Sequence, residues 1–195
     1  MRIEHLSKSY AGSPVLADFT LELAEGNVYA LLGASGSGKT TLLHILMGLI
    51  PPDGGMISGI SGKHISAVFQ EDRLFGFLTA AENIAAVRPG GSIRDKGLID
   101  GLNKYLAEIL PEESLNKKVA AYSGGMKRRV SIARCVLAQS DVLVMDEPFS
   151  GLDEETKGRT AAFIQKYRAG RTLIFSTHDS GDAALLQAEK IFLCS

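Results

Sequence analysis

The chain has 195 residues, 45% of them hydrophobic and 22% charged, and its formal net charge at pH 7 is −1. This length allows one domain with a sizeable core, and the near-neutral charge gives no sign of a nucleic-acid partner held by bulk electrostatics. The cysteines, Cys135 and Cys194, form no disulfide framework, which favours a reduced, cytosolic compartment. The chain has no signal sequence and no apolar run of about 18 residues, so we expect membrane association only through a partner.

Three strands are predicted before residue 33. Arg2 to Tyr10 form the first strand, which a turn at 11–14 ends. Residues 19–23 alternate between apolar and polar side chains, a pattern typical of a half-exposed strand in an antiparallel pair. Residues 28–32 are all apolar, which indicates a buried strand.

A glycine-rich segment follows this buried strand and fits the pattern G-x-x-x-x-G-K-[ST], the Walker A or P-loop signature. The apolar residues 42–47 predict a helix after it, so the motif lies between a strand and a helix, as it must. Glycines let successive N–H groups point into one concavity that holds anions, and the helix start adds free N–H groups. A glycine-rich turn with a solvated lysine is the simpler alternative. The expected nucleotide-binding residues of the loop are Gly33, Ala34, Ser35, Gly36, Ser37, Gly38, Lys39, Thr40 and Thr41.

Helical patterns dominate the middle of the chain. Residues 66–69 predict a buried strand that ends at Gln70, and Thr79 with Glu82 then forms a capping box that opens a helix. From about 72 to 138 we predict helices and no strand, a lobe inserted into an otherwise α/β chain.

A second candidate anion site lies in this lobe. Ser123 is the expected N-cap of a helix, and Gly124 and Gly125 leave backbone N–H groups bare at its start. A simple helix cap explains these three residues equally well. The basic run 127–129 that follows is interpreted as a solvated helix face.

Strands return after the lobe, at 142–145, 172–176 and 190–194, with helices predicted at 154–168 and 182–187. Strands that alternate with helices imply a parallel sheet, which binds ligands outside the carboxyl ends of its strands. The residues that directly follow predicted strands should therefore converge. They are the P-loop, Gln70, Asp146, Glu147 and His178.

The two acidic residues suit phosphate chemistry. Asp146 is placed to hold a Mg²⁺ shell, and Glu147 is placed to polarise a water for attack on a γ-phosphate. Solvated carboxylates at a strand end, and a solvated histidine at 178, are the simpler alternatives.

The order of these motifs closely resembles the ATP-binding cassette (ABC) ATPases over almost the whole chain. The resemblance implies that Tyr10 stacks on adenine, that Gln70 contacts Mg²⁺ and senses the partner, and that His178 touches the γ-phosphate. It implies that Glu147 is the catalytic glutamate, and that Thr40 and Asp146 serve Mg²⁺, Asp146 through water. The residues that match the signature and the D-loop, and that act on the partner's ATP, are Ser123, Gly124, Gly125 and Asp153.

The chain departs from the family pattern at Tyr122 and Met126, where leucine and glutamine are usual. We expect function to survive because the phosphate-binding Ser123, Gly124 and Gly125 are kept. The segment 51–68 is short, and little follows the strand after His178, so no C-terminal regulatory domain is expected. The segment from Gln70 to Ile84 looks most like importers of the nitrate, sulfonate and taurine type.

The resemblance implies a single ABC ATPase domain over residues 1–195, with an α/β P-loop NTPase fold. A mostly parallel central sheet and an N-terminal antiparallel β-subdomain would form the core from 1–71 and 139–195. The helical subdomain, at about 72–138, would carry the signature.

The function implied is an ATP-binding and ATP-hydrolysing subunit of an ABC transporter. It would work as a head-to-tail dimer, with itself or a paralogue, around two ATP–Mg²⁺ sites. An integral membrane permease would dock near Glu71–Arg88 and hold the chain on the inner face of the cell membrane, with no direct nucleic acid.

Two other functions compete with this one. A soluble ABC ATPase acting on nucleic acid or ribosomes would usually carry a long coiled-coil insertion or two cassettes. A P-loop kinase or GTPase would not explain Ser123-Gly124-Gly125 or His178.

Overall fold

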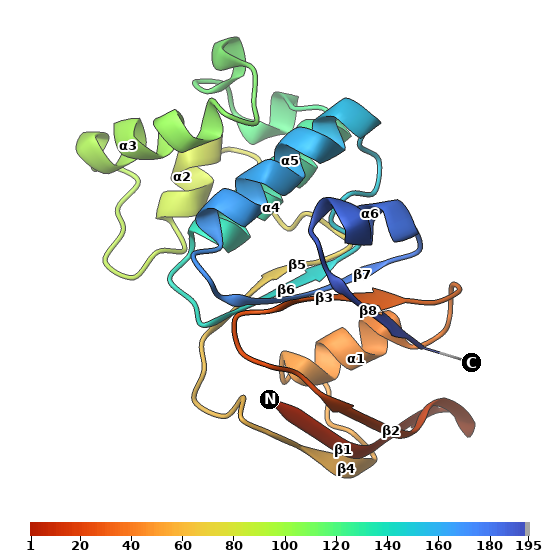
Figure 1. Cartoon of the computed structure of the whole chain (residues 1–195). Coiled ribbons are helices and arrows are strands. Elements are labelled where there is room, and N and C mark those ends of the chain that lie inside the picture. Colours follow the sequence, from red (N-terminus) through yellow and green to blue (C-terminus); the bar gives the residue numbers. More distant parts are fainter. Residues whose placement is uncertain (194–195) are drawn as a thin grey trace. The chain divides into compact units, whose positions relative to one another are not determined.

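The computed structural model describes residues 1–193, which divide into two compact units (Figure 1). The first unit comprises Met1–Ile65, Ser140–Glu147 and the chain from Gly170, and the second comprises Ser66–Gln139 and Pro148–Ala169. Cys194, in the last predicted strand, lies outside the described residues. Among residues 1–193 no helix has the length and apolar character needed to cross a membrane.

An antiparallel sheet of three strands belongs to the first unit. It contains β1 (Arg2–Tyr10), β2 (Ser13–Glu22) and β4 (Gly54–Ser58), in the order β2-β1-β4. Both pairings are antiparallel, as expected for β2. The sequence pattern did not predict β4, because this strand begins with two glycines and is only five residues long.

A parallel sheet with the strand order β5-β6-β7-β3-β8 has four of its strands, β3, β6, β7 and β8, in this unit. Its strands are β3 (Val28–Leu32), β5 (Ile65–Val68, which passes into the second unit), β6 (Val142–Asp146), β7 (Thr172–Thr177) and β8 (Glu189–Phe192). β3 pairs with β7 and β8, and β6 pairs with β7, all in parallel. Every residue of β3, β6 and β7 is buried, as in parallel sheets covered on both faces. The predicted parallel sheet is confirmed.

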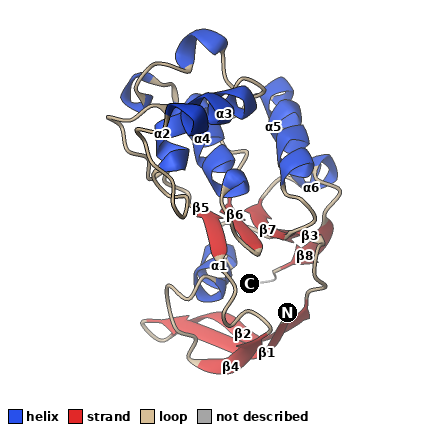
Figure 2. Ribbon diagram, turned by 90° about the vertical axis from the view of Figure 1, so that its left-hand side faces the viewer, coloured by secondary structure: helices blue, strands red, loops and turns tan. Residues whose placement is uncertain are grey.

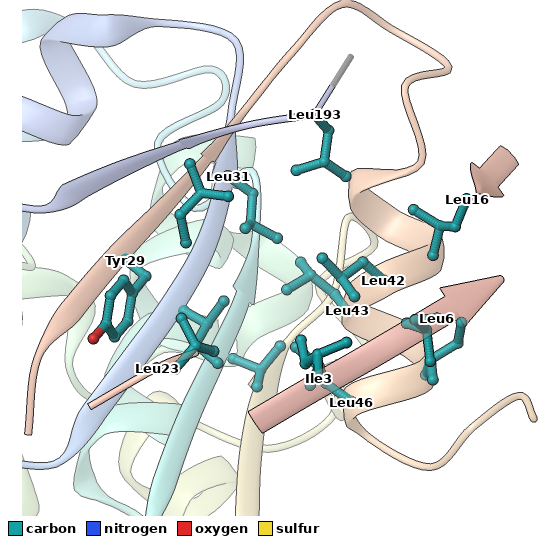
Figure 3. Packing of buried hydrophobic residues seen from close by; sticks show 14 of the residues in the cluster. Ile3, Leu6, Leu16, Leu23, Tyr29, Leu31, Leu42, Leu43, Leu46 and Leu193 are labelled. Carbon is teal, nitrogen blue, oxygen red and sulfur yellow. The ribbon is translucent and has the colours of Figure 1, made fainter. Parts of the chain in front are cut away.

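Helices cover both faces of this parallel sheet, α1 (Lys39–Leu46) on one face and α6 (Ser180–Leu185) on the other (Figure 1). Figure 3 shows leucines of α1 in one buried cluster with side chains of β1, β2 and β3. Full burial of one leucine side chain stabilises the fold by about 1.5–3 kcal/mol, so this cluster fixes α1 and the loop that precedes it. Its labelled members are Ile3, Leu6, Leu16, Leu23, Tyr29, Leu31, Leu42, Leu43, Leu46 and Leu193.

The second unit is mainly helical (Figure 2). It contains α2 (Ala80–Ala85), α3 (Lys96–Leu106), α4 (Gly124–Leu137) and α5 (Glu154–Tyr167), with short 3₁₀ helices at Glu112–Ser114 and Val119–Ala121. The predicted capping box is present, since the Thr79 hydroxyl and the Glu82 carboxylate each accept a hydrogen bond from the other's backbone N–H. Residues 72–138, all of them described, contain no strand.

Candidate functional site

The segment 33–38 turns sharply between β3 and α1, and two of its glycines are required by its geometry. Gly38 has a φ of 90°, in the left-handed region, and a Cβ atom there would lie 2.9 Å from the carbonyl oxygen of Val15. A Cβ atom on Gly33 would lie 2.5 Å from the Ser37 Oγ and 2.7 Å from the carbonyl oxygen of Leu193. A side chain at either glycine would therefore push the loop out of place.

Lys39 places its ammonium group over this loop. The side chain is held inside the fold, with the residue only 7% exposed, and its Nζ donates to the carbonyl oxygens of Gly33 at 2.7 Å and Ala34 at 2.9 Å. An ammonium has three N–H donors, so one remains for a phosphate oxygen. Ser37 is also buried, and its hydroxyl has no hydrogen-bond partner among residues 1–193. Anionic oxygens within the loop would satisfy both groups.

Asp146 joins the end of β6 to α1 and β7. Its Oδ2 accepts a hydrogen bond from the Thr40 Oγ1 at 2.9 Å, and its Oδ1 accepts one from the Ser176 hydroxyl. The residue is 3% exposed, yet its carboxylate forms no ion pair with another described residue. A buried carboxylate is normally paired with a cation or bound to a metal, so this position suits a metal ion.

The oxygen ligands at this position fit Mg²⁺. Within the described part of the chain, no cluster of three or more His, Cys, Asp or Glu side chains could hold a metal by itself. Mg²⁺ commonly binds through one or two carboxylates together with substrate phosphates and water. Thr40 and Asp146 therefore have the right chemistry to share Mg²⁺ with a nucleotide.

Glu147 follows Asp146 in an unusual backbone conformation. Its φ is 45°, in the left-handed region that residues other than glycine rarely adopt. The Ser176 hydroxyl accepts a hydrogen bond from the Glu147 N–H at 2.9 Å, so one serine side chain fixes both acidic residues. This conformation is enforced by the surrounding structure, a pattern found at functional sites.

His178 lies close to this glutamate, in the turn between β7 and α6. Its Nδ1 is 3.6 Å from the Glu147 Oε1, too long for a direct hydrogen bond but close enough for the two side chains to interact electrostatically. The turn is held by the Thr177 hydroxyl, which donates to the Asp182 Oδ2 at 2.6 Å and accepts from the Asp179 N–H. The histidine side chain is 70% exposed and free to meet a ligand.

The structure thus brings the P-loop, Asp146, Glu147 and His178 together, at the carboxyl ends of β3, β6 and β7. Tyr10 ends β1 in the same unit, with its ring half exposed and the Lys8 Nζ 5.8 Å from the ring centroid. Gln70 belongs to the second unit, and its exposed side chain has no partner among the described residues.

The other predicted anion site lies in the second unit. Ser123 caps α4, because its Oγ accepts a hydrogen bond from the Met126 N–H at 3.3 Å. Asp153 caps α5 in the same way, and hydrogen bonds from Thr156 lower the pKa of its carboxyl. A Cβ atom on Gly125 would lie 3.3 Å from a methyl group of Leu152, so the starts of the two helices are neighbours.

Tyr122, one of the two departures from the family pattern, has a clear structural role. The ring is buried, and its hydroxyl donates to the carbonyl oxygen of Ser114 at 2.8 Å. Burial raises the pKa of this hydroxyl, which stays protonated and keeps its hydrogen bond at neutral pH. The tyrosine fills a core position and ties residue 114 to the start of α4.

The interpretation of 127–129 as a solvated helix face is wrong. Arg128 is only 7% exposed, and its guanidinium donates to the carbonyl oxygens of Phe69 and Gln70. Arg129 donates to the carbonyl oxygens of Ile109 and Gly125. The arginines are half or fully enclosed because backbone carbonyls from distant segments partner them, and the local sequence gives no sign of these partners.

Ser176 is a site residue that the sequence analysis missed. The sequence pattern marks it only as the end of an apolar strand, and its register partner across the sheet is Asp146. A hydroxyl in a fully buried strand needs a hydrogen-bond partner. That requirement, combined with the strand pairing, could have identified it.

Comparison with known proteins places these features in a family. A family model described as "ABC transporter" matches residues 16–150. The spermidine/putrescine import ATP-binding protein PotA of Fusobacterium nucleatum is 34% identical over 194 residues, which cover 94% of this chain and 52% of PotA. The sulfate/thiosulfate import ATP-binding protein CysA of Brucella melitensis is 34% identical over 210 residues, covering 100% of this chain and 58% of CysA. The chain thus spans little more than half the length of these two relatives.

A shorter relative and a solved structure match over more of their length. The aliphatic sulfonates import ATP-binding protein SsuB of Delftia acidovorans is 35% identical over 199 residues, covering 99% of this chain and 78% of SsuB. The dimeric structure of MJ0796, described as a bacterial ABC transporter cassette, superposes with a TM-score of 0.85 at 27% identity, covering 98% of this chain and 93% of that one. With its P-loop, its paired acidic residues and a family match that includes both, the chain belongs to the ABC transporter family.

Proposed function

We propose that this chain binds and hydrolyses ATP and thereby energises an ABC importer. The observation that carries this proposal is the hydrogen bond between Thr40 and Asp146, which joins the phosphate-binding loop to the acidic end of β6. PotA, CysA and SsuB are all named as import ATP-binding proteins, which supports import over export. Substitution of Lys39, which should abolish ATP binding, and of Glu147, which should slow hydrolysis, tests the ATPase activity itself.

Each site residue has a separate role in the proposed reaction. Residues 33–41 and the Lys39 ammonium hold the phosphates, and Tyr10 stacks on the adenine. Glu147 accepts a proton from a water molecule, whose oxygen bonds to the γ-phosphorus while the bond to ADP breaks. His178, beside Glu147, donates a hydrogen bond to the γ-phosphate. Mg²⁺, held by Thr40, Gln70 and, through water, Asp146, would supply charge neutralisation at the phosphates.

We further propose that two chains form a head-to-tail dimer around two ATP molecules. Each chain carries two candidate anion sites, the P-loop in its first unit and the Ser123–Gly125 turn in its second. In a two-fold dimer the second site of one chain completes the nucleotide site of the other, with Asp153 beside it. The similar MJ0796 structure is described as dimeric, and a second MJ0796 structure is described as a dimer bound to ADP and phosphate.

Mixing two inactive variants tests this dimer. We expect Ser123→Arg and Lys39→Ala chains each to be inactive alone, since each variant spoils both sites of its own homodimer. Their mixture should regain ATPase activity, because the heterodimer contains one site with an intact P-loop and an intact Ser123. Steady-state ATP hydrolysis measures this recovery. Absence of recovery, with heterodimers demonstrated by tagged co-purification, would rule out the shared site.

We also propose that a membrane permease docks on the segment Glu71–Arg88 and holds the chain on the inner face of the membrane. Phe75 and Phe77 are 44% and 73% exposed, and their ring centroids are 6.0 Å apart. The buried Asn83 side chain bonds both the N–H and the carbonyl of Phe75, so this exposed pair is held in place by the fold. Leu78 packs inside the unit and offers no surface. Exposed apolar patches commonly mark interaction sites.

A charged residue in this pair should release the chain from its permease. We expect Phe75→Glu and Phe77→Glu to keep ATP binding but to lose co-sedimentation with membranes that contain the permease, since docking would bury the new charge. The control is Phe192→Glu, a substitution of a phenylalanine 67% exposed in the first unit. Equal sedimentation of all three variants would place the dock elsewhere.

A further inference from the structure

One face of α4 forms hydrogen bonds with the backbone of the loop that contains Gln70. Arg128 donates to the carbonyl oxygens of Phe69 at 2.6 Å and Gln70 at 2.7 Å. One turn further on, the Ser131 Oγ donates to the carbonyl oxygen of Asp72 at 2.8 Å. Residues three apart lie on the same side of a helix. We call residues 69–73 the Gln70 loop, and Arg128, Ser131 and Arg134 the α4 clamp.

Arg134 completes the clamp at the far end of the loop. Its guanidinium donates to the carbonyl oxygens of Arg73 at 2.9 Å and Asp72 at 3.3 Å. The loop follows β5 and belongs to no helix or strand, so its carbonyls have no regular ladder of partners. The clamp supplies these partners for most of the loop.

The loop itself has a compact shape that this clamp fits. Arg73 has a φ of 44°, in the left-handed region, and its guanidinium lies 3.9 Å from the centroid of the Phe69 ring. This cation–π contact joins the two ends of the loop. Because the chain turns back on itself, several of its carbonyls face α4.

Burying the guanidinium of Arg128 costs free energy that packing alone would not require. Its side chain is 9% exposed, and the carboxylate of Asp72 lies 3.5 Å away. A buried guanidinium is tolerated only when it is paired and hydrogen-bonded. An apolar side chain would fill the same space without that requirement, so the role of Arg128 lies in its directed bonds.

The clamp fixes the backbone of Gln70 and leaves its side chain free. The carbonyl oxygen is held by Arg128, while the carboxamide is exposed and has no partner in the described chain. We infer that Arg128, Ser131 and Arg134 are positioning residues that fix the backbone at Gln70 and thereby set the direction in which its carboxamide leaves the loop. This inference rests on the proposed role of Gln70 in ATP hydrolysis.

The test compares Arg128→Met with Lys127→Met, which removes one positive charge from the neighbouring position of α4. We expect Arg128→Met to lower kcat about ten- to hundredfold, the range typical of residues that orient a metal ligand through a hydrogen bond. KM for ATP should change little, because the P-loop is untouched. Lys127→Met should keep wild-type kinetics, and hydrogen exchange of the amides at 69–73 should rise in Arg128→Met alone.

A double-mutant cycle separates positioning from general loss of stability. In a Gln70→Ala background, Arg128→Met should cause no further loss of kcat, since the group that it positions is gone. Ser131→Ala removes a single hydrogen bond of the clamp and should also lower kcat. This milder variant keeps the test valid if Arg128→Met fails to fold. An equal loss of kcat from Arg128→Met in both backgrounds would overturn the inference, as would a wild-type kcat in both Arg128→Met and Ser131→Ala. Either result would leave the proposed function standing. Absence of Lys39-dependent ATP hydrolysis in the wild-type chain would overturn the proposed function, and the inference with it.

Discussion

Replacing Glu147 with glutamine is expected to leave ATP binding intact and to lower kcat by about 10²–10⁴, the usual contribution of a general base. The amide keeps the shape of the side chain and its hydrogen bonding, but it cannot accept a proton from the attacking water. The backbone at 147 should hold its position, because the bond from its N–H to Ser176 does not involve the side chain.

Single-turnover ATP hydrolysis, with ATP affinity measured in parallel, checks this expectation. The matched control is Glu155→Gln, which changes an exposed carboxylate that pairs with Arg159 one turn along α5. This control should keep the wild-type rate. A Glu147→Gln rate within about threefold of wild type would assign the proton transfer to another group.

Removing the Lys39 side chain should abolish tight ATP binding. Its ammonium is the cation fixed over the loop, by the carbonyl oxygens of Gly33 and Ala34. Hydrogen bonds between charged groups are roughly twice as strong as neutral ones, so no neutral side chain replaces them. Loss of the ammonium also leaves these two carbonyl oxygens facing the incoming phosphates, which adds repulsion.

Calorimetric titration of Lys39→Ala with ATP–Mg²⁺ measures this loss. Lys63→Ala provides the control, since Lys63 lies in the same unit and pairs with Glu25. It should bind ATP like the wild type. Wild-type affinity in Lys39→Ala would contradict the assignment of residues 33–41 as the phosphate-binding loop.

Much of the fold could be predicted because the chain alternates apolar strands with helical patterns. β3, β6 and β7 are runs of buried residues whose hydrophobicity is visible in the sequence. β4 could not be predicted in the same way, since its residues are partly exposed and two are glycines. β4 is a strand because it pairs with β1, and pairing between distant segments cannot be predicted from local sequence.

The site shows the same division. The P-loop, Asp146 and His178 are found from motifs and from their positions after strands. The residues that hold Asp146 and the backbone of Gln70 in place are not found in this way, because Ser176 and Arg128 act through partners 30 and 59 residues away. The role of a hydroxyl or guanidinium group depends on the acceptor to which it donates, and that acceptor is determined only when the chain has folded.

The backbone of Glu147 has a consequence for how this protein can evolve. A left-handed φ on a residue with a side chain costs roughly 1–3 kcal/mol, a sizeable fraction of the marginal stability of a domain. Glycine would relieve that strain and would remove the carboxylate proposed to activate water. Selection for thermal stability alone would therefore favour glycine at position 147, whereas selection for ATP turnover would retain the glutamate. With the proposed role of Glu147, activity and stability would make opposite demands on this single backbone angle.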